Sequence, residues 1–326
     1  MMRFLGRRLA LMPLALVIVN FLGFSYAHAA QQLHAAQNPF GSAVEAPPSI
    51  LRLYGHYVRA LMQGNWGTMP TVAAEPIGAL LLQTGLVSLG LLLIVFVLST
   101  LLGLVIGVAG VRNQPPRLAP WLTPFTALGL ATPGFYLGTI VITLLLVLLI
   151  YGNADPELLL PLQGFGWDRH LILSTLALVV RPMAQVAQTT ATLLVEELGR
   201  PYITAARGRG FRPLRVLLRH AMGNVWPPLL MTMTASLRLL TGELLLVEKL
   251  FGWPGLGRLV TTALVPPSTA MVGSMAGAAS YFLYPELVAG ALTAFALLFL
   301  LIDLGAALLV HRLDPRLRQA VAVPLG

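Results

Sequence analysis

Long uncharged stretches alternate with short polar segments along this chain. No residue is charged between Glu75 and Arg112 or between Arg117 and Asp155, and further apolar stretches begin near positions 170, 225 and 286. A membrane-spanning helix requires about 20 consecutive, mostly apolar residues. Together with an apolar N-terminal segment, the pattern predicts six membrane-spanning helices, at about 9–27, 80–111, 121–150, 170–195, 225–247 and 286–310.

The predicted connections are an external segment at 28–78, a cytoplasmic loop at 196–224, an external loop at 248–285 and a cytoplasmic tail at 311–326. Residues 259–285 are also uncharged, but they are rich in Gly, Ser, Thr and Pro. A seventh span there would place the arginines of the tail outside, so we interpret this stretch as an external or re-entrant loop. The expected fold is an all-α membrane protein in which residues 1–326 form a single transmembrane domain.

The first apolar segment has two interpretations. Arginines at positions 3, 7 and 8 precede it and the tripeptide at 27–29, Ala-His-Ala, follows it. This is the pattern of a secretory leader with a small-residue cleavage site, but the segment also suits a first membrane helix. We favour the uncleaved helix, because five further spans follow and a leader adds nothing to their insertion.

The arginines and the single lysine set the predicted orientation. With the N-terminus inside, cytoplasmic segments hold 14 of the 21 basic residues and external segments hold five, and two lie within spans. Cytoplasmic loops of membrane proteins carry an excess of Lys and Arg. Both termini are therefore predicted to be cytoplasmic.

Composition supports a membrane protein and argues against several other classes. The chain is 57% hydrophobic and 10% charged, whereas soluble domains carry about 25% charged residues. The net charge of +9 follows from arginines that flank apolar runs, so nucleic-acid binding is not expected. Cysteine is absent, the histidines are scattered, and the one lysine is not in a phosphate-binding loop. We expect no catalytic residue, metal site or bound cofactor, and hence no enzyme.

The cytoplasmic loop is the most informative segment. Pro201 suits the first turn of a helix, and Ile203, Ala206 and Gly210 follow at helical spacing. A second helix is predicted from Pro213, with leucines 214, 217 and 218 on one face and arginines 212, 215 and 219 on the other. From the residues alone, a basic loop lying on anionic lipid remains an open alternative.

The same segment resembles the EAA loop of ABC-transporter permeases, and in particular the dipeptide, oligopeptide and nickel permeases. Residues 202–210 read Tyr-Ile-Thr-Ala-Ala-Arg-Gly-Arg-Gly, followed by Arg219-His220-Ala221, Asn224 and Pro228. Two positions depart from the family pattern, where Pro201 replaces Asp and Thr204 replaces Glu.

Three further stretches resemble the same family. Residues 247–259 look like its V-E-x-x-F-x-W-P-G-L-G-R-L motif. Asp303 and the sequence Leu-Asp-Pro-Arg at 313–316 look like its closing motif, and residues 57–67 resemble its external segment before the second helix.

The resemblance implies a type I importer permease in a bacterial plasma (inner) membrane. Its implied partners are a second, paralogous permease, two ABC ATPases that use ATP and Mg, an extracytoplasmic solute-binding protein and membrane lipid. The implied ATPase-coupling residues are Tyr202, Thr204, Ala205, Ala206, Arg207, Arg209 and Gly210, which would seat a short helix on one ATPase. The implied external turn comprises Glu248, Phe251, Trp253, Pro254, Gly255 and Gly257. An ATP-independent secondary transporter or channel is the alternative.

Four ionisable residues fall within predicted spans, where burial of charge is costly. They are Arg181, Arg238, Glu243 and Asp303. Arg238 and Glu243 lie about 140° apart around one helix, so neither pairs well with the other. We expect Arg238 and Glu243 each to meet Arg181 or Asp303 on another helix. There are two alternatives for Glu243: it lines the transport path and meets a substrate ammonium, or it is solvated near the external interface.

Overall fold

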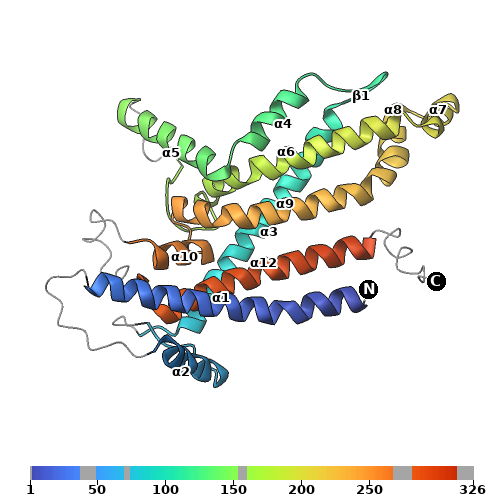
Figure 1. Ribbon diagram of the computed structural model, residues 1–326. Helices are drawn as coiled ribbons and strands as arrows, with labels where there is room; N and C mark the ends of the chain where they lie inside the picture. The colour runs from blue at the N-terminus through green and yellow to red at the C-terminus, as the bar shows by residue number, and fades with distance from the viewer. Residues whose placement is uncertain (1, 37–48, 70–73, 153–159, 267–280, 314–326) are drawn as a thin grey trace. The chain divides into compact units, whose positions relative to one another are not determined.

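The computed structural model describes residues 2–36, 49–69, 74–152, 160–266 and 281–313 (Figure 1). Within these ranges six helical stretches are long and apolar enough to cross a membrane, which confirms the predicted number. They are Leu9–Leu33, Ile77–Ala109, Gly134–Tyr151, His170–Leu198, Pro213–Phe251 and Pro285–Leu309.

Most of the long helices extend beyond the apolar runs that predict them. Their bounds are α1 Met2–Ala36, α3 Ile77–Ala109, α6 His170–Leu198, α9 Met222–Phe251 and α12 Pro285–Leu313. Backbone hydrogen bonding continues past the last apolar residue, whereas hydropathy marks only the part suited to lipid. α1 is continuous through residues 27–29, and Ala27 is fully buried.

The predicted span at 121–150 is wrong as a single helix. It consists of α4 Leu122–Ala131 and α5 Gly134–Tyr151, separated by Thr132 and Pro133. Both intervening residues are extended, with ψ angles of 110° and 143°. Proline cannot donate a backbone hydrogen bond, so the helix breaks although the sequence remains apolar across the break.

The connections also contain structure that the sequence pattern did not predict. A two-stranded antiparallel hairpin follows α3, with β1 Val111–Asn113 paired to β2 Pro116–Leu118 through a cis Gln114–Pro115 peptide. The predicted external segment contains α2 Ile50–Met62, and the predicted external loop contains α10 Leu256–Leu264. The remainder of that loop at 267–280, and the tail motif from position 314, lie outside the described residues.

The contacts within the chain divide it into two compact units. One comprises residues 1–89 and 254–301, and the other comprises residues 90–253 and 302–326.

In the first unit, α1 lies beside α12 and α2 (Figure 1). The amide of Asn20, which is buried in α1, donates to Thr293 of α12 at 3.0 Å and to Tyr57 of α2 at 3.3 Å, and accepts from Tyr54 at 3.2 Å. Polar groups in an apolar surrounding are costly unless paired, so this network fixes the three helices relative to one another.

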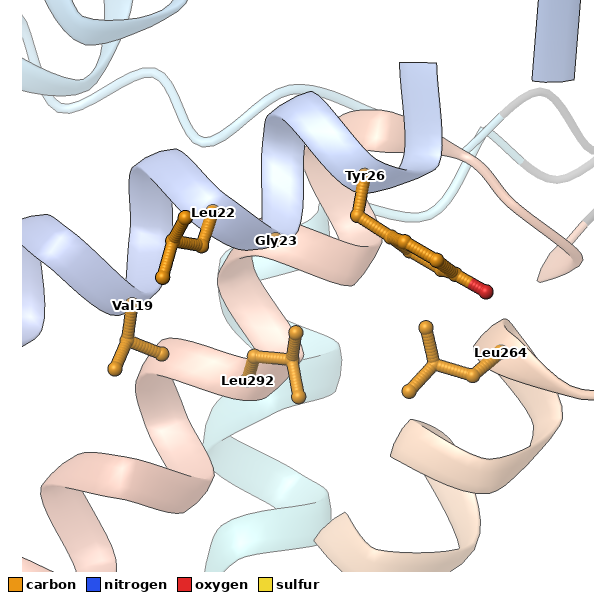
Figure 2. Close-up of a pocket in the computed structure, with 6 residues that line it drawn as sticks. All are labelled: Val19, Leu22, Gly23, Tyr26, Leu264 and Leu292. Carbon is orange, nitrogen blue, oxygen red and sulfur yellow. The ribbon is translucent and has the colours of Figure 1, made fainter. Parts of the chain in front are cut away.

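The same unit contains an apolar pocket of about 330 Å³. Its lining residues, drawn in Figure 2, are Val19, Leu22, Gly23, Tyr26, Leu264 and Leu292.

In the second unit, α6 packs along α9 and α4 (Figure 1). α3 approaches α6 through two glycines. A Cβ atom at Gly103 would lie 2.7 Å from the Cβ of Val186, and one at Gly107 would lie 2.6 Å from the Cβ of Thr190. Helices in lipid associate largely through such close packing, because the surrounding lipid is as apolar as their side chains.

Candidate functional site

The predicted coupling segment is a short helix at the end of α6. α7 Pro201–Gly208 begins with proline in its first turn, after an extended Arg200. Ile203 is fully buried and Ala206 is 7% exposed; both belong to a core cluster with Leu194 and Leu198 of α6 and Val216, Leu217 and Ala221 beyond α7. Of the three residues noted at helical spacing, Ile203 and Ala206 lie on the buried side of α7, whereas Gly210 is exposed and lies beyond the helix.

A polar network holds the other side of the first turn of α7. The hydroxyl of Tyr202 donates to Oε1 of Glu197 at 2.6 Å. Nδ2 of Asn224, at the start of α9, lies 2.9 Å from the same carboxylate oxygen and 3.0 Å from the hydroxyl of Tyr202. Partial burial, and then the hydrogen bond to Glu197, raise the pKa of Tyr202. The network therefore ties α7 to both α6 and α9.

Arg207 binds within the chain. Its guanidinium Nη2 donates to the carbonyl oxygen of Asn113 at 3.1 Å, which joins the end of α7 to the β1–β2 hairpin. Arg207 thus has one partner within the chain, and its role in ATPase coupling stays a prediction. Arg209 is exposed.

The outward surface of α7 is small and polar. Thr204, Ala205, Gly208 and Arg209 are exposed, and Cβ atoms at Gly208 and Gly210 would meet open space. Gly210 has a φ angle of +81°, a conformation that favours glycine, and it ends the segment. An exposed surface of small residues beside the exposed Arg209 suits close approach by another protein.

The predicted second cytoplasmic helix is not separate from the next span. α8 Pro213–Arg215, the π-helix η1 Val216–Ala221 and α9 run on without interruption. The predicted leucine face is also wrong, because Leu217 is buried whereas Leu214 and Leu218 are 63% and 52% exposed. Val216, the first residue of η1, belongs to the core cluster instead.

The four intramembrane charges form two ion pairs between helices. Nη1 of Arg181 in α6 lies 2.6 Å from Oε1 of Glu243 in α9, and Nε of Arg238 in α9 lies 2.6 Å from Oδ1 of Asp303 in α12. The second oxygen of Glu243 accepts the backbone N–H of Gly134 at 3.1 Å. A substrate ammonium at Glu243 would have to compete with the Arg181 guanidinium.

The predicted external turn falls into parts that belong to different units. Glu248, Phe251 and Trp253 are buried at the end of α9. There Gly252 adopts a left-handed φ of +67° and the N–H of Trp253 donates to the carbonyl of Glu248 at 2.9 Å. This is the geometry of a glycine helix cap.

The rest of the turn leads into α10. Pro254 is half-buried, Gly255 and Gly257 are buried, and the N–H of Leu256 donates to Oγ of Ser88 at 2.8 Å. Gly255 is the residue that precedes the helix.

Sequence reasoning missed the partners of the coupling segment. Glu197, Asn224 and Asn113 had no assigned role, although Asn224 stands in the family pattern. Their partners lie up to 94 residues away in the chain, so local spacing could not reveal them.

Comparison with known proteins agrees with this geometry. The family described as "Binding-protein-dependent transport system inner membrane component" matches residues 99–319. The chain is 28% identical to a probable peptide ABC transporter permease protein, y4tP, of Sinorhizobium fredii, over 81% of this chain and 79% of that protein. It is 28% identical to the dipeptide transport system permease protein DppB of Lactococcus lactis, over 79% and 85%.

A third relative is the glutathione transport system permease protein GsiC of Salmonella typhimurium, 29% identical over 81% of this chain and 78% of that protein. The described part of the structure has six apolar helices and a short helix, α7, anchored between two of them, and the family match covers about two thirds of the sequence. The chain therefore belongs to the inner membrane components of binding-protein-dependent transport systems, as a multi-pass plasma-membrane permease subunit of an ABC importer.

Proposed function

We propose that this permease carries peptides and that α7 couples it to a partner ATPase. The observation behind this proposal is the construction of α7. One side is fixed to the core by Ile203 and Ala206, the first turn is fixed to α6 and α9 by Tyr202, and the opposite side is exposed. A helix built in this way has a free surface and firm attachments to two spans.

The coupling would be mechanical. A force on α7 passes to α6 through Glu197, which accepts a hydrogen bond from Tyr202. It passes to α9 through Asn224, which donates to both Glu197 and Tyr202. Closure of two ATPases around ATP and Mg would then move these spans together, as a rigid-body change between two states. In this proposal the ATPases supply the chemistry and the present chain supplies the path.

The proposed partners are two ATPases, an extracytoplasmic binding protein and a second, paralogous permease. Peptides are the proposed substrates, because the names of these relatives include peptide, dipeptide and glutathione transport. The first relative is named as an ABC transporter permease, which favours the ATP-driven importer over an ATP-independent transporter.

The coupling surface is tested by adding bulk to it. Ala205→Trp places an indole on the exposed side of α7, whereas Gly6→Trp places the same group at an exposed glycine of α1 whose Cβ would meet open space. Tagged full-length chains are solubilised from native cells, and co-purifying ATPases are identified by mass spectrometry.

We expect ATPases to accompany the wild type and Gly6→Trp and to be lost from Ala205→Trp at equal membrane levels. Recovery of the same ATPases with Ala205→Trp would refute the role of α7. The substrate class is tested separately by uptake of labelled trialanine and glutathione into cells with and without the chain. Equal uptake in both cell types would refute a peptide substrate of this size.

A further inference from the structure

The break between α4 and α5 leaves the first turn of α5 short of acceptors. The N–H groups of Tyr136 and Leu137 donate to the carbonyl of Pro133, both at 3.1 Å. The N–H of Gly134 has no acceptor within its own helix, and no capping side chain precedes it. An unpaired backbone N–H inside a membrane costs several kcal/mol.

Glu243 of α9 supplies the missing acceptor from 109 residues away. Its Oε2 accepts the N–H of Gly134 at 3.1 Å while its Oε1 accepts from Arg181 of α6 at 2.6 Å. The side chain of Glu243 is 12% exposed and that of Arg181 is 32% exposed. A carboxylate at a helix N-terminus also interacts favourably with the helix dipole. One side chain thus joins α5, α6 and α9.

α5 contacts α6 and α9, but few of its residues are buried. Its buried residues are Gly134 and Gly138. A Cβ at Gly134 would lie 2.6 Å from Oε2 of Glu243 and 2.8 Å from the carbonyl of Ala177, and one at Gly138 would lie 2.8 Å from Leu250. Because most of α5 is exposed and its link to α4 is broken, its direction depends on how its first turn is held.

We propose that Glu243 is a positioning residue for transport, which sets the direction of α5 against α6 and α9 through both of its carboxylate oxygens. This inference rests on the proposed function. α9 carries Asn224 of the α7 network and, 19 residues further, Glu243, about 28 Å along a regular helix. Movement of α9 at α7 therefore reaches α5 through Glu243.

Four variants separate a positioning role from simple neutralisation of a buried charge. Glu243→Gln and Arg181→Gln each break the ion pair. The double variant Glu243→Gln/Arg181→Gln removes both charges and keeps an oxygen for the N–H of Gly134. The double variant Glu243→Leu/Arg181→Leu removes both charges and that acceptor as well. Double substitution avoids leaving one unpaired charge in the membrane.

Movement of α5 is measured directly by spin labelling. The sequence contains no cysteine, so a label at Ile140→Cys reports on the exposed surface of α5 and one at Leu128→Cys reports on α4 as a matched control. In Glu243→Gln we expect greater label mobility at 140, because the Arg181 guanidinium and the Gly134 N–H then compete for a single side-chain oxygen. The double leucine variant should show the same increase because it has no acceptor, and no change is expected at 128 in either variant. The double glutamine variant is expected to resemble the wild type at both positions.

Uptake of labelled trialanine supplies the functional measurement. We expect the maximal rate to fall about tenfold in Glu243→Gln and in the double leucine variant, the effect of losing one charge-assisted hydrogen bond. KM and ATPase co-purification are expected to stay unchanged. Recovery of at least half the rate in the double glutamine variant is the result that supports positioning.

The inference would be overturned if the double leucine variant had the same uptake rate and the same label mobility as the double glutamine variant. Glu243 would then only neutralise Arg181. Unchanged mobility at 140 in Glu243→Gln would overturn it as well. Failure of the proposed function would be recognised separately, in the wild type. No ATPases would co-purify with it, or it would not support trialanine uptake. The label comparison at 140 and 128 still decides the role of Glu243 in that case.

Discussion

Replacement of Ile203 by alanine is predicted to free α7 from the core without unfolding the rest of the chain. Ile203 is fully buried among residues of α6 and η1. The change removes three carbon atoms, each worth about 0.8 kcal/mol of burial, and leaves a cavity. The measured range for such substitutions is about 2–5 kcal/mol. Because α7 has only eight residues, this loss is concentrated in one short helix.

Hydrogen–deuterium exchange over residues 201–208 is the appropriate assay. A loss of about 2 kcal/mol raises the equilibrium population of the open state of α7 about 30-fold. Amide exchange in α7 should therefore accelerate by at least that factor where the exchange rate is proportional to this population. Exchange in the central part of α6 should stay unchanged. ATPase co-purification should weaken in parallel.

Leu214→Ala is the matched control, because leucine and isoleucine lose the same number of carbons. Leu214 is 63% exposed, and substitutions at such positions typically change stability by less than about 0.5 kcal/mol. Similar acceleration of exchange in the two variants would refute the argument that burial of Ile203 holds α7 in place.

Three further outcomes are expected. Gly107→Val should lower the melting temperature of the solubilised chain by several degrees, because its Cβ would meet Thr190 at 2.6 Å, whereas Gly242→Val, whose Cβ meets open space, should not. Asn20→Leu should cost about 1–2 kcal/mol of unfolding free energy, since its three partners lose their hydrogen bonds; an unchanged denaturation midpoint would contradict this. Tyr202→Phe should lower the melting temperature by a constant amount from pH 6 to 9. The pKa of Tyr202 is raised, so its contribution is present below about pH 10 and is lost only above it; a difference that varies between pH 6 and 9 would count against the network.

Much of the membrane topology follows from composition along the chain. Apolar runs locate the spans because lipid offers no partner for polar groups, and only a helix satisfies its own backbone there. The cost of intramembrane charge likewise indicates that Arg181, Arg238, Glu243 and Asp303 require partners on other helices, and the two pairs found are between helices.

Hydropathy could not locate the break in the third span. Thr132 and Pro133 lie in an uninterrupted apolar stretch, and hydropathy does not count backbone hydrogen bonds. The break is tolerated because Glu243 accepts the N–H of Gly134. Likewise, no residue type in the segment 216–221 marks its π-helix.

The sequence by itself determined that this is a membrane protein with six spans and that its intramembrane charges must be paired. Those properties depend on local composition and spacing. Tertiary structure decided that Arg181 pairs with Glu243, that Arg207 binds Asn113, and that α5 begins where a distant carboxylate accepts its first N–H. These contacts join residues 62 to 109 positions apart, and only packing of the helices brings such residues within hydrogen-bonding distance.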